Sequence, residues 1–281
     1  MLISKVDLVM WTKNGSSTLP LVLKRIDEVI PEEFVNNRIL VDDQSIDTTR
    51  DIAKSFGWKV FFNEAKGIGS GANTALKHVT SDLFISFEQD LLLAKGWWNK
   101  VPRHLKDDKV AVASGVRVSD HPCGLKKVQE YSTKRMAKMG DPFYGKTFDN
   151  TIYKTNIIRK LGGFPNLSVS AGLDSVLAYK VFSAGYEWRV DYTTLSLHLR
   201  HGLRDALAHY YWYGTVYEKL RPLLHEKKFG LRRNVLRVFV SPLIGLDMTI
   251  KEAAPEAFYI YPFIRLNVLK GILDGRRKYT R

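Results

Sequence analysis

The sequence predicts an α/β fold: a mostly parallel sheet flanked by helices on both faces. In the first half of the chain, short runs of β-branched and apolar residues alternate with segments whose apolar residues repeat at helical spacing. Two of the apolar runs, residues 39–41 and 83–87, end directly in acidic residues. Short runs of this kind, joined by short polar connections, are typical of buried parallel strands covered by helices.

The elements of the first half follow in a regular order. The expected strands are residues 6–11, 38–41, 58–62 and 83–87. The expected helices are residues 18–29, 47–56 and 67–78, with Asp47 as a candidate cap and glycines at the start of the third helix.

The second half is less regular. We expect a strand at 110–118, a short helix within 151–161, a helix at 174–184 and a strand at 187–197. Beyond residue 202 the pattern becomes helical and aromatic. We therefore expect two domains, an α/β domain at 1–201 and a helical extension at 202–281.

Composition bounds the class of protein. With 281 residues and 45% hydrophobic content, the chain is long enough to bury a full core. Cys123 is the one cysteine, so we expect no internal disulfide and a reducing, cytoplasmic setting. The N-terminal residues lack the layout of a signal peptide, and no stretch approaches the roughly 20 apolar residues of a membrane span.

The chain is strongly basic, with a net charge of +14. From His201 onward there are 15 Lys and Arg against 7 Asp and Glu. Such a balance suits nucleic acid, an anionic membrane surface or a phosphorylated substrate, and it also suits a surface that is merely well solvated.

Acidic residues stand where two expected strands end. Asp42 and Asp43 follow the first of these strands, and Glu88 and Asp90 follow the second. Open α/β sheets bind ligands at the carboxyl ends of their strands. Carboxylates there can hold the N–H groups of a base or a divalent cation that bridges phosphates. The sequence therefore predicts binding of a nucleotide that carries a diphosphate.

Five motifs, in this order over roughly residues 5–201, resemble those of the family 2 glycosyltransferases of the GT-A fold. They are Thr12-Lys13-Asn14, the segment 41–47 with Asp42-Asp43 and Gln44 in place of glycine, the glycine-bearing segment 67–73, Glu88-Gln89-Asp90 in place of Asp-x-Asp, and Gly162-Gly163-Phe164.

The resemblance implies an inverting, metal-dependent enzyme. It would transfer a sugar from a UDP- or GDP-sugar to a glycan or lipid-linked acceptor. The implied donor-nucleotide residues are Thr12, Lys13, Asn14, Asp42, Asp43, Gly69, Asn73 and Glu88. Of Asp42 and Asp43, one is expected to hold the nucleoside and the other to shape the turn, and either assignment is open. Gly162, Gly163 and Phe164 would lie on the acceptor side.

The same resemblance implies a site for Mn²⁺ or Mg²⁺. Asp90, the last acid of its motif, would bind the ion, which would offset the charge on the departing nucleoside diphosphate. His198 is the candidate that completes the metal site, and His201 competes with it. The alternatives are a solvated strand end with two acids, and a structural histidine.

Asp174 is the candidate general base. The family has Glu-Asp before an apolar run, whereas this chain has Leu173-Asp174. An inverting transfer needs a carboxylate that takes the proton of the attacking hydroxyl. Capping of the helix that follows is the structural alternative, and both roles are compatible.

The helical extension mixes aromatic and basic residues. Residues 209–217 are aromatic on every helical face, and 258–265 and 270–278 interleave aromatic or apolar residues with Arg and Lys. Core packing is one use of such segments, and peripheral contact with the inner face of an anionic membrane is another. A self-packed cap and a homodimer surface fit equally.

Three other functions compete with glycosyl transfer. A nucleotidyltransferase would carry a glycine-rich basic loop after the first strand, and residues 13–17 are a faint version of it. A nucleic-acid-binding protein is disfavoured, because acids at the ligand edge repel a phosphate backbone, so no nucleic acid is expected. A protein that binds a nucleotide sugar without turnover is the third.

Overall fold

A computed structural model describes residues 5–120, 124–139, 144–167, 171–199, 202–220, 222–224 and 231–279. Cys123 and His201 lie outside these residues, so the expectations placed on them have no structural counterpart. The chain divides into two compact units. One comprises Met1–Arg117 and Phe143–Leu199, and the other Val118–Pro142 and Arg200–Arg281.

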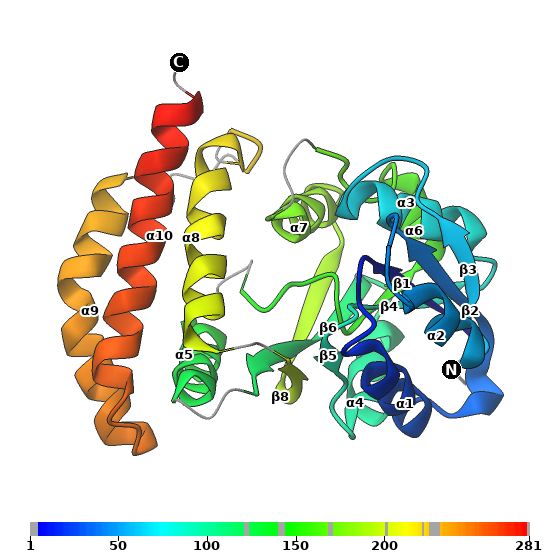
Figure 1. Cartoon of the computed structure of the whole chain (residues 1–281), viewed down its shortest axis with the longest axis horizontal. Coiled ribbons are helices and arrows are strands. Elements are labelled where there is room, and N and C mark those ends of the chain that lie inside the picture. Colours follow the sequence, from blue (N-terminus) through cyan, green and yellow to red (C-terminus); the bar gives the residue numbers. More distant parts are fainter. Residues whose placement is uncertain are drawn as a thin grey trace. The chain divides into compact units, whose positions relative to one another are not determined.

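The first unit is built on a sheet of eight strands in the order β3-β2-β1-β4-β7-β6-β8-β5 (Figure 1). Four consecutive strands in this order pair in parallel: β3 (Lys59–Phe62), β2 (Val35–Asp42), β1 (Val6–Thr12) and β4 (Leu83–Phe87). These are the strands expected from the first half of the sequence, and β1 lies fully buried between β2 and β4.

The other four strands of the sheet include antiparallel pairings and two short strands that the sequence did not predict. Its strands are β5 (Leu91–Leu92), β6 (Val110–Ser119), β7 (Thr151–Lys154) and β8 (Glu187–His198). β7 pairs antiparallel with both β4 and β6, and β5 pairs antiparallel with β8. β5 and β7 were not predicted, since two and four residues are too few for a recognisable alternation.

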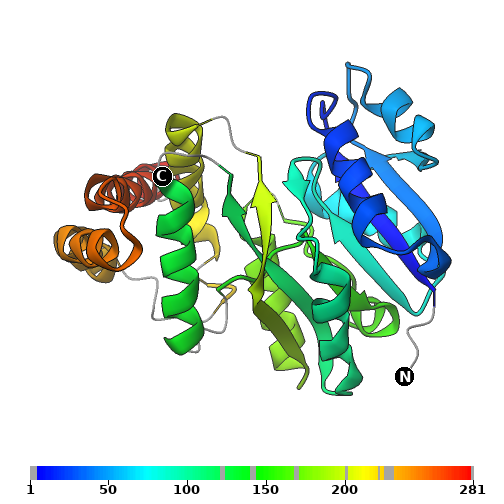
Figure 2. The ribbon, with the colours of Figure 1, turned by 90° about the horizontal axis from the view of Figure 1, so that it is seen from below.

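Helices cover both faces of the sheet (Figures 1 and 2). On one face lie α1 (Leu19–Val29), α2 (Thr49–Ser55), α4 (Trp97–Lys100) and the 3₁₀ helix Val101–Lys106; on the other lie α3 (Ile68–His78), α6 (Thr155–Lys160) and α7 (Leu173–Ser183). A further 3₁₀ turn, Glu32–Phe34, precedes β2. Alternate residues of β1 supply the two cores: Leu8 and Met10 face the first, and Val9 and Trp11 face the second. The predicted fold class is confirmed.

The second unit is helical. It contains α5 (Leu125–Met139), α8 (Leu203–Leu220), α9 (Leu231–Glu252) and α10 (Ala257–Tyr279). Its core joins Leu125 and Val128 of α5 to Met248 of α9 and to Ile260 and Ile264 of α10. The sequence did not assign α5 to this group of helices. Within the part of the chain that the structure describes, no helix combines the length and apolarity required to cross a bilayer.

Candidate active site

The register of the parallel strands brings the predicted acidic residues to one edge. Thr12 of β1 pairs with Asp42 of β2, and Met10 of β1 pairs with Phe87, the last residue of β4. Asp42 and Glu88 therefore flank the end of β1, each at the point where its own strand stops. The expectation that these acids share one rim of the sheet follows directly from the parallel arrangement.

A group of three metal-ligating side chains lies at this edge. Glu88, Asp90 and His198 each offer a ligand atom, and these atoms lie within 4.8 Å of one another. Antiparallel pairing of Leu91 with His198, together with the Leu199 N–H donated to the Asp90 carbonyl at 2.8 Å, brings the two segments together. His198 Nε2 lies 3.1 Å from Asp90 Oδ2. Two half-buried carboxylates and a buried imidazole are a donor set that suits Mn²⁺ and also accepts Mg²⁺.

Gln89 lies between the two acids, and its side chain connects the turn at residues 88–90 to the end of β1 through hydrogen bonds. Its Oε1 accepts the Lys13 N–H at 2.9 Å and the Thr12 hydroxyl, and its Nε2 donates to the Lys13 carbonyl at 3.1 Å. A Cβ at Gly15 would lie 2.9 Å from this amide, so a larger residue there would displace the Gln89 side chain. Sequence analysis did not single out Gln89, although a polar side chain between two acids was a visible signal.

Asn14 connects the loop after β1 to the loop after β2. Its N–H donates to Ser45 Oγ at 2.8 Å, and its Oδ1 accepts the Ile46 N–H at 2.9 Å. Asn14 has a φ of +50° and Gln44 a φ of +62°. Asparagine adopts this left-handed region readily. Gln44 adopts it with a conformational free-energy cost that the family's glycine at this position would avoid.

Asp42 and Asp43 make different contacts. Asp42 is fully buried, and its Oδ2 accepts the Ser45 N–H at 3.1 Å, while its Oδ1 has no hydrogen-bond partner among the described residues. Asp43 is half-buried, and it accepts the Asn63 side-chain amide at 3.2 Å and the Gly67 N–H at 3.3 Å. Asp42 thus shapes the turn, and Asp43 faces the glycine-bearing start of α3.

Asn73 and Gly69 are used to pack α3 against the Gly162-Gly163-Phe164 turn. The Asn73 side chain donates to the Phe164 carbonyl at 2.9 Å and accepts the Phe164 N–H at 2.9 Å. A Cβ at Gly69 would lie 2.3 Å from the Pro165 carbonyl oxygen, so α3 approaches this turn closely.

The turn itself depends on its two glycines. Gly162 and Gly163 have φ values of +80° and +73°, in the left-handed region that favours glycine. The Phe164 ring that follows is buried against the rings of Trp11, Phe84, Phe148 and Tyr153. These contacts hold α3 against the 162–164 turn, and the Phe164 side chain is part of the hydrophobic core.

Asp174 lies in the first turn of α7, where its Oδ1 accepts the Ser175 N–H at 2.8 Å. Burial raises the pKa of the Asp174 carboxyl to about 6, and the nearby Arg117 cation opposes this rise. Arg117 Nη1 donates to Glu88 Oε2 at 3.3 Å and to Asp149 Oδ2 at 3.0 Å. A single guanidinium thus links the metal-ligating group to the surroundings of Asp174.

Asp149 was missed by sequence analysis. It is fully buried, and its Oδ1 has no hydrogen-bond partner within the described part of the chain. Its negative charge raises the pKa of Asp174 further. The signal was an Asp-Asn pair directly before a strand, but β7 itself had not been predicted.

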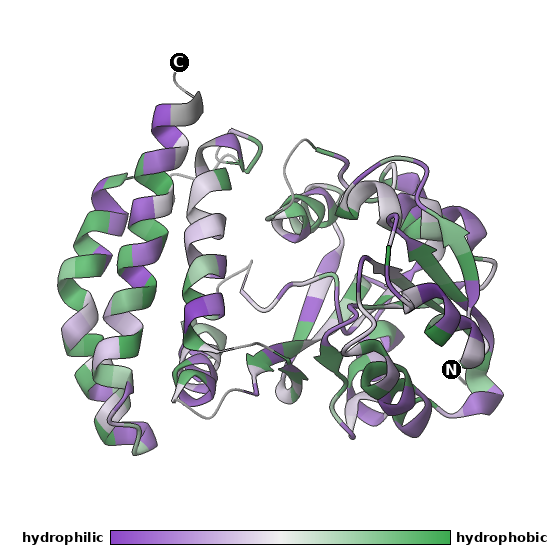
Figure 3. Cartoon of the chain, viewed as in Figure 1, coloured by the Kyte–Doolittle hydropathy of each residue, from purple (hydrophilic) through white to green (hydrophobic). Residues whose placement is uncertain are grey.

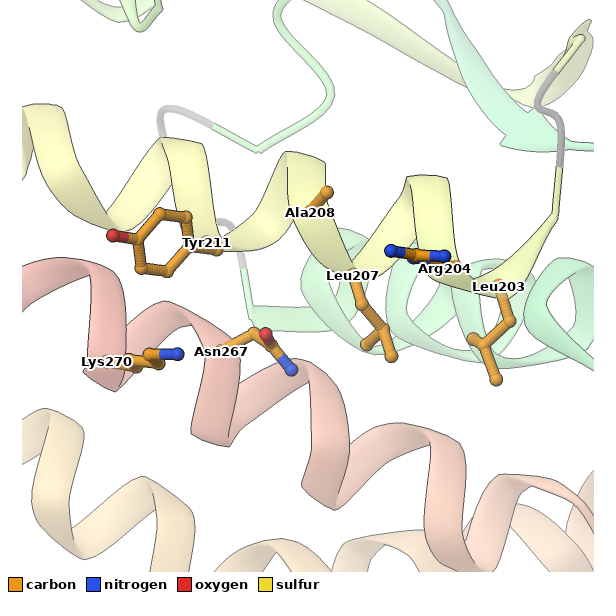
Figure 4. Close-up of a pocket in the computed structure, with 7 residues that line it drawn as sticks. All are labelled: Leu203, Arg204, Leu207, Ala208, Tyr211, Asn267 and Lys270. Atoms are coloured by element: carbon orange, nitrogen blue, oxygen red, sulfur yellow. The ribbon is translucent and has the colours of Figure 1, made fainter.

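The second unit holds a cavity of about 530 Å³ between α8 and α10 (Figure 4). Its lining is Leu203, Arg204, Leu207, Ala208, Tyr211, Asn267 and Lys270. It contains none of the predicted site residues, so the chemistry is assigned to the sheet edge of the first unit.

Several solved structures share this fold. A mannosyltransferase from Pyrobaculum calidifontis, PcManGT, in complex with GDP-Man and Mn²⁺, has a TM-score of 0.71 at 19% identity, covering 98% of this chain and 88% of that chain. Glucosyl-3-phosphoglycerate synthase from Mycobacterium tuberculosis, with Mn²⁺ and UDP, has a TM-score of 0.55 at 15% identity, covering 79% and 80%. S. aureus TarS 1–349 in complex with UDP has a TM-score of 0.54 at 13% identity, covering 99% and 93%. At these identities the likeness shows the fold alone.

The family is shown by the sequence itself. No curated protein matches the chain. The model of glycosyl transferase family 2, however, matches residues 7–162, more than half of the 281 residues. This match spans the strands β1, β2 and β4 and the acidic residues at their ends, and it favours glycosyl transfer over the nucleotidyltransferase and nucleic-acid-binding alternatives. The resemblance noted from the motifs is confirmed: the chain belongs to glycosyl transferase family 2 and is a glycosyltransferase of the GT-A fold.

Proposed function

We propose that this enzyme is an inverting, metal-dependent glycosyltransferase that moves a sugar from a nucleotide-diphosphate donor to a glycan or lipid-linked acceptor. The observation that carries the proposal is the group Glu88, Asp90 and His198, whose ligand atoms lie within 4.8 Å at the carboxyl edge of a parallel sheet. Acids at this edge would repel a pyrophosphate unless a cation lay between them.

Asp90, His198 and Glu88 would hold the ion, which is Mn²⁺ or Mg²⁺. Bound there, the ion would neutralise the negative charge that develops on the departing nucleoside diphosphate. Arg117 keeps Glu88 in place through the 3.3 Å contact to its Oε2. Gln89 holds the turn at residues 88–90 against Thr12 and Lys13 by hydrogen bonds. A displacement of the loop after β1 would therefore also displace this turn.

The nucleoside would lie over the loops that follow β1 and β2. Asp43 is the more accessible of the two acids there, and Lys13 and Asn14 are exposed beside it. We therefore assign contact with the base and ribose to Asp43, and assign to Asp42 the shaping of the turn through Ser45. Gly69 and Asn73 would act indirectly, because they fix the position of α3.

The donor is proposed to be a UDP- or GDP-sugar. PcManGT was solved with GDP-Man and Mn²⁺, and glucosyl-3-phosphoglycerate synthase with UDP and Mn²⁺. These ligands support a nucleotide sugar and a divalent cation for this chain, and leave the base and the sugar to be measured.

Asp174 would take the proton of the attacking acceptor hydroxyl. A pKa of about 6 suits this role, because the carboxylate is ionised near neutral pH and is a stronger base than an ordinary aspartate. Leu173, at the position of the family's glutamate, is buried in the core of the first unit. Acceptor recognition here would therefore proceed without a carboxylate from that position.

A lipid-linked acceptor would place the enzyme at the inner face of a membrane. A soluble glycan acceptor would not require this location. We expect the cytoplasmic compartment in either case, and a homodimer through the helical unit is the competing use of its surface.

A thermal-shift screen of UDP- and GDP-sugars, each with and without Mn²⁺, tests the proposal. We expect one nucleotide sugar to raise the melting temperature of the full chain only when Mn²⁺ is present. At a ligand concentration about 100 times Kd, binding adds about 2.7 kcal/mol to stability. Release of the nucleoside diphosphate on addition of an acceptor extract would then identify the acceptor class.

Asp90→Asn should abolish the Mn²⁺-dependent shift, because it removes a charged oxygen ligand. Asp108→Asn is the matched control, since Asp108 is a fully exposed acid in the same unit. Stabilisation by no nucleotide sugar, or an equal shift in Asp90→Asn and wild type, would overturn the proposal.

A further inference from the structure

α9 presents large apolar side chains to solvent along one face. The ribbon of α9 in Figure 3 carries many hydrophobic residues, drawn in green. The exposed residues are Leu236, Phe239, Leu243, Leu246 and Ile250. Their spacing of three and four residues places them in one row along the helix. Phe239 is 76% exposed, Leu243 69% and Ile250 73%, so the described residues leave most of each of these three residues uncovered. We call this row the α9 apolar face.

The opposite side of α9 packs against the rest of its unit. Of its buried positions, Asn234, Ser241 and Gly245 are polar or small, and Met248 is the large apolar one. A Cβ at Gly245 would lie 2.9 Å from the Ala257 carbonyl oxygen, so α9 approaches the start of α10 closely through this glycine. A surface helix of a globular protein normally has the reverse arrangement, with its apolar residues inward.

α10 also exposes large apolar residues, although its other side buries Ile260 and Ile264 in the core of the unit. Its exposed large residues include Tyr259, Phe263 and Leu266. It packs on α8 through glycine, because a Cβ at Gly271 would lie 2.1 Å from the Tyr211 carbonyl oxygen. Exposed large apolar residues on two helices that pack together are typical of a surface that contacts a protein or a membrane.

The described charges beside the α9 apolar face are mostly positive. Arg232, Arg233 and Lys251 are exposed, and the helix also carries two acids, Asp247, whose side chain is 41% exposed, and Glu252. Those acids are already neutralised: Asp247 pairs with Lys251 at 2.8 Å, and Glu252 with Lys134 at 2.8 Å. α5, which packs against α9, adds four exposed cations besides Lys134, namely Lys126, Lys127, Arg135 and Lys138, against one half-buried acid.

We propose that the α9 apolar face docks on an anionic bilayer, with α9 lying in the plane of the lipid headgroups. The apolar row would enter the boundary with the acyl chains, and the flanking cations would reach lipid phosphates. Each Lys or Arg near such a surface adds electrostatic attraction to the anionic lipids. A second copy of this chain fits the face less well, because a symmetric contact would bring two cationic rims together.

Flotation of the full chain with vesicles tests this docking without any donor, metal or acceptor. The probes are vesicles of phosphatidylcholine alone and of phosphatidylcholine with about one third phosphatidylglycerol. We expect flotation with the anionic vesicles, weakened by salt, and little with the neutral ones. Phe239→Ser with Leu243→Ser should lower the partition coefficient roughly tenfold or more, because two exposed side chains no longer enter the lipid.

Leu21→Ser is the matched control, since Leu21 is an exposed leucine of α1 in the other unit, and it should float like the wild type. Arg232→Glu with Arg233→Glu should weaken flotation while leaving the apolar row intact. Equal flotation of the wild type and the Phe239/Leu243 variant, or flotation of neither, would overturn the docking. A stable dimer in light scattering that the same variant dissociates, without vesicle binding, would assign the face to a second copy instead. Because no nucleotide is involved, these outcomes are independent of the thermal-shift screen.

Discussion

Asp174 combines a raised pKa with a place near Arg117, the cation that contacts Glu88 of the proposed metal site. Because the base must be ionised to accept a proton, we expect the transfer rate to fall as pH drops through about 6, the pKa of this carboxyl. Asp174→Asn should lower kcat by about 10²- to 10⁴-fold and remove this limb of the profile. Steady-state rates from pH 5 to 8 with the identified acceptor measure both effects. Retained activity in the variant would argue against a base role and would favour an acceptor, such as a phosphate, that is already ionised.

Gln44 occupies a backbone conformation that suits glycine. Its φ of +62° costs an ordinary residue about 1–2 kcal/mol, and a β-branched residue more. Gln44→Val should therefore lower the free energy of unfolding by at least about 1 kcal/mol, whereas Gln44→Gly should be neutral or mildly stabilising. Urea unfolding of the two variants compares these effects. Equal stability of the valine and glycine variants would show that the turn relaxes to another conformation.

At the level of elements, glycine sets how closely α8 and α10 approach. The Tyr211 carbonyl oxygen lies where a Cβ of Gly271 would be placed, at 2.1 Å, and backbone atoms cannot move aside as a flexible side chain does. Gly271→Ala should force the helices apart and cost about 1–3 kcal/mol. Gly96→Ala is the control, because the nearest atom to its Cβ would be Lys100 Cε at 3.9 Å. A urea midpoint of Gly271→Ala equal to that of the control would mean that the two helices pack more loosely than described.

The elements that sequence patterns predicted are those with enough residues to show a period. Strands β1 and β4 and helix α3 were predicted nearly to the residue, because their burial is dictated by their own apolar runs. β5 and β7 escaped notice, because their short pairings are fixed by β8, β4 and β6, which lie far along the chain. α5 is a different case: Leu125 and Val128 are its only buried apolar residues, so its apolar stripe is too short to stand out in the sequence.

At the scale of the whole molecule, the sheet edge was predictable because parallel strands align their carboxyl ends. Asp42, Glu88 and Asp90 were placed by this rule alone. The rule says nothing about which side chains hold the acids in position. Gln89, Arg117 and Asp149 act through contacts 29 to 77 residues apart in sequence, so one sequence contained no local signal for their partners. The family resemblance implied that Asn73 binds the donor. In the structure its side-chain amide makes two hydrogen bonds with the backbone of Phe164.

The raised pKa of Asp174 also makes a prediction about the stability of the whole fold. In the unfolded chain its pKa returns to about 3.8, so the folded state holds the proton more tightly between roughly pH 4 and 6. The fold is therefore free of any penalty from this group below about pH 4, loses stability as pH rises to about 6, and bears the full cost above it. Asp174→Asn removes that cost, while Arg117 keeps its contacts with Glu88 and Asp149.

The variant should consequently be more stable than wild type at pH 7.5, by on the order of 1–3 kcal/mol, and equal to it near pH 4. Urea unfolding at the two pH values, without metal or nucleotide, measures the difference. A stability gain that is the same at both pH values would trace to packing instead of ionisation. The other outcome is a variant that gains stability only at neutral pH and also loses transfer activity. That result would mean that the wild-type enzyme has a less stable fold because it keeps a basic carboxylate where the acceptor binds.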